Sequence, residues 1–121
     1  MFSYKNNTIK GFTLIEIMMV MAIIGILAAI AIPQFASNRI KGYETVAKID
    51  GKSSYTAAQT FFSDSPTGIL TQAALISYGF KSTPGVTIGI TNGTAAALAI
   101  TTVNTSGGRT FSVDYNGNIT P

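Results

Sequence analysis

The chain has 121 residues, which is enough for one small domain and a separate N-terminal segment. Only 11% of its residues are charged, against about 25% in an average globular protein. It contains neither Cys nor His, which excludes disulfides, thiol or histidine catalysis and metal sites built on those ligands. No cluster of Lys and Arg with interleaved aromatic residues is present, so no specific nucleic-acid partner is expected.

The N-terminal part divides into a short polar segment and a long apolar one. Residues 1–11 are weakly basic and lack the apolar stretch of a conventional secretory signal. Residues 12–32 carry a single charge, Glu16, and as a helix they would span about 31 Å, close to the thickness of a bilayer core. A helix buried in a soluble core is the alternative, but so short a chain leaves too little structure to enclose it. We therefore expect a membrane-spanning helix, and Lys5 and Lys10 favour a cytoplasmic N-terminus.

Pro33 ends the purely apolar stretch and is expected to kink the helix or to open it locally. Small and apolar residues then recur at helical spacing through residues 34–62, which predicts an amphipathic continuation of the same helix. Glu44 and Lys48 have the favourable i, i+4 spacing on it. Together these segments predict one helix from residue 12 to residue 62, about 75 Å long.

The remainder of the chain predicts a connecting segment and a small sheet. Residues 63–84 form the connection, with a short helix from Thr71 to Tyr78 that has Thr71 as its candidate N-cap and Gly79 at its C-terminal stop. Residues 85–121 predict an antiparallel sheet of three or four strands, and the Asn-Gly pairs at 92–93 and 116–117 predict tight hairpin turns. The expected fold class is α+β, with the long helix packed on the sheet. The four expected strands cover residues 86–90, 95–103, 110–115 and 118–120.

The segment from Lys10 to Glu16, KGFTLIE, resembles the processing site of type IV prepilins and of the related pseudopilins. The resemblance continues through Gly25 and the segment IAIPQF at residues 30–35, and it covers about a third of the chain. It implies that prepilin peptidase cuts after Gly11 and that Phe12 is then N-methylated. Residues 1–11 would be the removed leader, and residues 12–33 would remain as the anchor. Glycine also gives a cutting enzyme an unobstructed backbone.

Glu16 needs an explanation, because an isolated charge at the centre of a bilayer costs about 3 kcal/mol or more. Cleavage would create an amine at Phe12, one helical turn away, that could neutralise Glu16 of the same subunit or of a neighbour. The resemblance favours the neighbour during filament assembly, whereas the alternative places Glu16 unpaired among the headgroups. For Gly25 and Pro33 the resemblance implies helix flexibility during packing, and the alternative is an ordinary irregularity of a membrane helix.

The resemblance implies a structural subunit, the major pilin of a type IV pilus, and the alternative is a type II secretion pseudopilin or a minor pilin. Its partners would be further copies of itself in a helical homopolymer, prepilin peptidase and the inner-membrane pilus assembly machinery. The chain would first be a single-pass inner-membrane protein and then part of an extracellular pilus. Whether that filament serves twitching motility, cell adhesion, DNA uptake or secretion stays open.

Two further kinds of site have weaker support in the sequence. A membrane-anchored enzyme would need a nucleophile with a base or a pair of carboxylates, but the acids after Glu16 are scattered, so neither catalysis nor a cofactor is expected. Residues 114–118 faintly resemble part of a calcium loop, with one carboxylate and no distal Glu, and a plain turn is favoured. Many pilins close this region with a disulfide; here turns and strand pairing must hold it.

Overall fold

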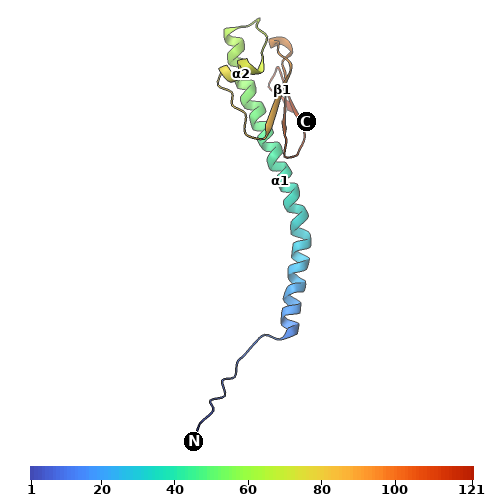
Figure 1. Cartoon of the computed structure of the whole chain (residues 1–121). Coiled ribbons are helices and arrows are strands. Elements are labelled where there is room, and N and C mark those ends of the chain that lie inside the picture. The colour runs from blue at the N-terminus through green and yellow to red at the C-terminus, as the bar shows by residue number, and fades with distance from the viewer. The chain divides into compact units, whose positions relative to one another are not determined.

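A computed structural model describes all 121 residues, which fall into two compact units, residues 1–36 and residues 37–121. Helix α1, Leu14–Asp64, contributes residues to both units. The predicted α+β class is confirmed, since the second unit contains the C-terminal half of α1, a short helix α2 and a four-stranded antiparallel sheet (Figure 1).

The first unit consists of a segment without regular secondary structure, residues 1–13, and the N-terminal half of α1. Nearly every side chain between Leu14 and Ile32 is exposed. By length and composition, α1 is the one helix that could cross a membrane. The helix continues through Pro33 without a break.

The sheet of the second unit has the strand order β1-β2-β3-β4, in which each strand pairs with its neighbour in sequence. Ile88 of β1 pairs with Thr102 of β2, and Val113 of β3 pairs with Ile119 of β4. Because neighbouring strands are antiparallel and the connections between them are short, one apolar face can form from residues that alternate along each strand. The strands are β1 Val86–Asn92, β2 Ala99–Asn104, β3 Phe111–Asp114 and β4 Ile119–Thr120.

The core lies between this apolar face and the C-terminal half of α1. Ala58 of α1, Ile100 of β2 and Val113 of β3 are fully buried there. Gly51 allows the helix to approach the sheet closely, since a Cβ at this position would lie 3.1 Å from Cγ2 of Val113. Gly51 weakens the intrinsic helix propensity by up to about 1 kcal/mol, and this close approach accounts for its place in α1.

Two buried polar side chains of the second unit join α1 to the rest of the fold. Thr102 Oγ1 of β2 donates a hydrogen bond to the carbonyl oxygen of Ala47, at 3.0 Å. The buried carboxylate of Asp50 accepts hydrogen bonds from the backbone N–H and the hydroxyl of Thr83, at 2.6 and 2.8 Å. The connecting segment is therefore fixed to α1 just before β1 begins.

The predicted short helix is confirmed as α2, Gln72–Ser77. Thr71 is its N-cap, because the side-chain oxygen accepts a hydrogen bond from the backbone N–H of Ala74 at 3.2 Å. Gly79 ends the helix with a φ of +88°, in the left-handed region that glycine adopts without strain.

The prediction for residues 92–103 is wrong in its first half. Residues Ala95–Ala97 form a 3₁₀ turn, and β2 begins only at Ala99. Asn92 does not start a tight turn, because its Oδ1 accepts hydrogen bonds from the backbone N–H and hydroxyl of Thr94. The connection is wider for a tertiary reason: the carbonyl oxygen of Gly93 accepts the N–H of Leu70, at 2.7 Å, from the connecting segment.

The predicted turn at residues 116–117 is confirmed. The N–H of Gly117 donates to the carbonyl oxygen of Asp114 at 2.9 Å, and Gly117 has a φ of +81°. Tyr55 of α1 packs on this turn, and its hydroxyl donates to the carbonyl oxygen of Tyr115 at 3.2 Å. A Cβ on Gly117 would lie 2.8 Å from the Tyr55 ring. This contact joins the last hairpin to α1 in a chain that has no cysteine.

We expect Gly117→Ala to lower the free energy of unfolding more than Gly79→Ala does. Both glycines have positive φ, so both changes carry a strain of about 1–2 kcal/mol. Only Gly117 also faces a side chain, since a Cβ on Gly79 would meet nothing within 4 Å. Urea unfolding of the detergent-solubilised full chain, followed by circular dichroism, measures both losses. Equal losses would show that the Tyr55 contact contributes nothing.

Candidate functional site

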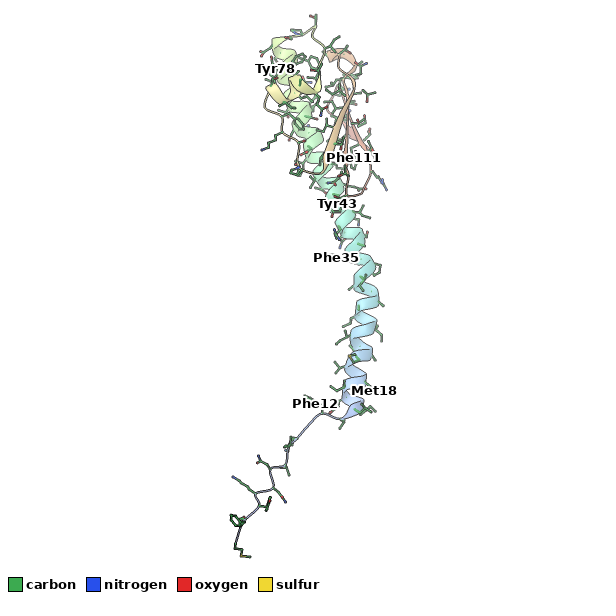
Figure 2. The ribbon with its side chains drawn as sticks, in the orientation of Figure 1. Phe12, Met18, Phe35, Tyr43, Tyr78 and Phe111 are labelled. Carbon is green, nitrogen blue, oxygen red and sulfur yellow. The ribbon has the colours of Figure 1, made fainter.

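The predicted cleavage point lies in the exposed segment that leads into α1. Gly11 and Phe12 are both exposed, and Figure 2 shows Phe12 where that segment meets the helix. Gly11 does not have a positive φ, and a Cβ built on it would meet nothing within 4 Å. The fold itself therefore does not require glycine at this position, so any requirement for it must come from another molecule.

Thr13 and Glu16 form a capping box at the start of α1. The backbone N–H of Thr13 donates to Oε2 of Glu16 at 2.7 Å, and the N–H of Glu16 donates to Oγ1 of Thr13 at 3.3 Å. This reciprocal pair satisfies two N–H groups that have no partner within the helix. It explains why α1 begins at Leu14 and not at Phe12 as predicted.

The role of Thr13 was not recognised from the sequence, although the pattern Thr-Leu-Ile-Glu at residues 13–16 is the usual signature of a capping box. The family resemblance concerns the cleavage point and the charge of Glu16, and not the helix cap. The structure of the uncut chain brings Glu16 into contact with its own backbone, and one carboxylate oxygen, Oε1, makes no hydrogen bond.

Glu16 also lines a shallow hollow together with Lys10, Gly11 and Phe12. Lys10 precedes the Gly11–Phe12 bond in the sequence and Glu16 follows it, and the two side chains form no ion pair within 4 Å. The partial positive charge at the N-terminus of a helix adds to the favourable surroundings of the Glu16 carboxylate. The candidate site is therefore an exposed peptide bond beside a positively polarised helix end.

Gly25 and Pro33 both lie inside α1, and they are not brought together with the junction. A Cβ on Gly25 would meet nothing within 4 Å. Around these two positions α1 exposes large apolar side chains, with Ile24 at 55%, Ile26 at 64% and Ile32 at 69%. So wide an apolar surface needs a lipid or protein environment to cover it.

The residues at 114–118 do not fit a calcium site in the observed arrangement. Oδ1 of Asp114 accepts the backbone N–H groups of Asn116 and Asn118, both at 2.9 Å, and Oδ2 accepts the side-chain amide of Asn118 at 3.2 Å. A cation would need oxygen ligands at this point, whereas three N–H groups face the carboxylate. Asp114 instead closes the turn that follows β3.

Hydrogen bonds to the charged form, foremost from the backbone of Asn118, lower the pKa of Asp114. A carboxyl whose pKa is lower in the folded state stabilises that state above its unfolded pKa, and this contribution is lost as the pH falls through the folded pKa.

We expect the last hairpin to loosen when the pH falls below the usual range of an aspartic acid. Protonation of Asp114 removes the acceptor for three N–H groups. Hydrogen–deuterium exchange of residues 111–120 across this acid range measures the effect. The matched variant Asp114→Asn should show no such pH dependence, and an equal response in both proteins would contradict the assignment.

Comparison with known proteins agrees with this geometry. The family model described as the prokaryotic N-terminal methylation motif matches residues 6–32, which include Gly11, Phe12 and Glu16. The chain thus belongs to the class of prokaryotic proteins that carry this motif, here at the start of an apolar helix.

Similar proteins identify the family more closely. The chain is 54% identical over 55 residues to the type IV major pilin protein PilA of Myxococcus xanthus, covering 46% of this chain and 25% of the relative. It is 41% identical over 87 residues to the type IV wide pilus major component PilA4 of Thermus thermophilus, covering 71% of this chain and 66% of the relative. It is 85% identical over 26 residues to the type IV major fimbrial protein FimA of Dichelobacter nodosus, covering 22% and 17%.

The chain belongs to the type IV pilin family. The aligned part spans about a quarter of the Myxococcus relative and 66% of the Thermus relative.

Proposed function

We propose that the chain is the major structural subunit of a type IV pilus and that it is made as a membrane-anchored precursor. The observation that carries this proposal is the exposed Gly11–Phe12 junction directly before the capped, apolar start of α1. The relatives named as major pilins and fimbrial proteins support it. The same relatives favour a structural role over a catalytic one.

The apolar half of α1 would have two environments in succession. In the precursor, lipid would cover it in the inner membrane, with residues 1–11 on the cytoplasmic side. In the fibre on the cell surface, the helices of neighbouring copies would replace the lipid. Removal of the leader takes away Lys5 and Lys10, so the same helix can leave the membrane without those two charges.

Fibres sheared from the cell surface distinguish a major pilin from a minor pilin or a secretion pseudopilin. We expect the mature chain to be the most abundant protein of the sheared fraction. Its absence from that fraction, while the chain is present in the membrane, would refute the major-pilin proposal and favour the pseudopilin.

We propose that prepilin peptidase cuts after Gly11 and that the new N-terminus at Phe12 is methylated. The fold leaves room for a side chain at residue 11, so a larger residue there would obstruct only the enzyme that binds this segment.

We expect Gly11→Val to leave the precursor uncut in the membrane, because a side chain beside the scissile bond blocks the peptidase. The matched control is Gly25→Ala, which also has open space around its Cβ but lies inside α1, and which should be cut normally. The mass and the N-terminal residue of the membrane-bound protein measure cleavage. Wild-type cleavage of Gly11→Val would overturn the processing site.

Assembly would use the carboxylate oxygen that the capping box leaves free. Oε2 of Glu16 accepts the N–H of Thr13, and Oε1 remains available for a cation. After cleavage, that cation would be the amine of Phe12 on a neighbouring subunit. A charged pair removed from water is far more stable than an isolated charge in lipid, so pairing would favour docking of each new subunit. Because the capping box uses only Oε2, it would persist in the fibre and would hold Glu16 in position for the amine of the neighbouring subunit.

Two substitutions of Glu16 separate the cap from the charge. We expect Glu16→Gln and Glu16→Ala both to be cut normally and both to reduce the yield of sheared fibres by about tenfold or more, if pairing contributes about 1.4 kcal/mol. Glutamine can still complete a capping box, so Glu16→Gln removes only the charge. Normal fibre yield from Glu16→Gln together with a defect in Glu16→Ala would show that only the cap matters.

We also propose that the helix loosens between Gly25 and Pro33 when subunits pack into the fibre. Proline has no N–H, so the carbonyl oxygen of Ala29 lacks its regular helical partner. This carbonyl, with the flexibility of Gly25, makes the stretch between them the weakest part of the apolar helix.

We expect backbone amides between residues 26 and 32 to exchange hydrogen faster in fibres than in the detergent-solubilised subunit. Pro33→Ala, which restores the missing N–H, should reduce the difference. If exchange in the fibre is as slow as in the subunit, the helix stays intact on assembly and the proposal fails.

A further inference from the structure

The chain has two Asn-Gly pairs, Asn92-Gly93 and Asn116-Gly117, and this pair has a chemistry of its own. The backbone nitrogen after an asparagine can attack the side-chain carbonyl carbon, and it does so most readily when the next residue is glycine, which has no Cβ in the way. In an unfolded chain the two pairs would react alike. The fold gives them different surroundings.

Both groups that would react at Asn92, its side-chain carbonyl and the backbone of Gly93, are restrained. Its Oδ1 accepts the N–H and the hydroxyl of Thr94, at 3.0 and 2.8 Å, which fixes the side chain. Gly93 packs directly on the backbone of Leu70, and its carbonyl oxygen accepts the Leu70 N–H at 2.7 Å. The hydrogen bonds to Oδ1 polarise the carbonyl group. Attack by the Gly93 nitrogen on that carbonyl also needs Gly93 to move, and the packing of Gly93 on Leu70 opposes this movement.

Asn116 is much less restrained. Its side chain is exposed, and it makes no hydrogen bond within the chain. Its backbone is restrained only within the turn: the N–H of Asn116 donates to Oδ1 of Asp114 at 2.9 Å, Gly117 lies against the ring of Tyr55, and the N–H of Gly117 donates to the carbonyl oxygen of Asp114 at 2.9 Å. This bond closes a turn beside β4, an edge strand of only two residues. Such short edge elements open locally at low free-energy cost.

We propose that Asn116 is a site of spontaneous covalent modification in the folded protein, and that Asn92 is protected. The nitrogen of Gly117 loses its proton and forms a bond to Cγ of Asn116. The bond from Cγ to the side-chain nitrogen breaks, and ammonia leaves with the proton, which produces a five-membered succinimide. Water then opens either of its two carbonyl groups, to give aspartate or isoaspartate. No oxidant, reductant or other protein takes part.

Either product changes the end of the chain. Aspartate at 116 adds a negative charge near the carboxylate of Asp114, whose Oδ1 already accepts the N–H of residue 116. Isoaspartate also inserts a CH₂ group into the main chain, which displaces Gly117 from the ring of Tyr55. The modification would therefore weaken the attachment of the last hairpin to α1 as the protein ages.

The test uses the full chain in detergent at mildly alkaline pH, sampled over weeks by peptide mapping and mass spectrometry, with a parallel sample in urea. We expect Asn116 to convert about tenfold or more faster than Asn92 in the folded sample, and the two to convert at similar rates in urea, because only local structure separates them. Thr94→Ala, which removes the hydroxyl hydrogen bond to Oδ1 of Asn92 and leaves the backbone one, should narrow the ratio, and Asn116→Gln should remove the product at 116.

A ratio near one in the folded protein, or faster conversion of Asn92, would overturn the proposal. The proposal would also be overturned if Asn116 kept its amide in the folded sample over the time in which both asparagines are converted in urea. Each result is read directly from the two peptides and does not depend on whether the chain assembles into a fibre.

Discussion

The apolar surface of α1 is the constraint on which the other features depend. The chain cannot cover the side chains between Leu14 and Ile32 itself, because its core is formed by residues after 46. Such a surface is stable only in lipid or against other apolar helices. The apolar half of α1 therefore has to be covered by lipid or by protein at each stage. The capping box contributes by satisfying two backbone N–H groups at the start of the helix.

The second unit solves a different problem, which is how a small sheet holds a helix with few charges and no disulfide. Close approach at Gly51, the Thr102 hydroxyl on the Ala47 carbonyl and the Tyr55 contact at the last turn each join the sheet to α1. These contacts come from β2, β3 and the last turn, and they hold residues 47–55 of α1 to the sheet.

The sequence predicted the elements that depend on local patterns. The long helix, the cap at Thr71 and the turn at Asn116-Gly117 follow from periodicity and from residues with strong conformational preferences. The error at residues 95–98 arose because an alanine-rich stretch has no distinct preference, and its conformation depends on where the connecting segment packs on Gly93. The burial of Asp50 was likewise unpredictable, since its partner Thr83 lies 33 residues away.

The way in which the last hairpin is fastened also sets the conditions under which the subunit can mature. A tail closed by a disulfide depends on an oxidising compartment and on an enzyme that forms the bond, and it opens again when reductant is added. In this chain Tyr55 and Asp114 close the tail through packing and hydrogen bonds alone. Closure is therefore a reversible equilibrium that is reached as soon as the unit folds, and it is independent of the redox state of the surroundings.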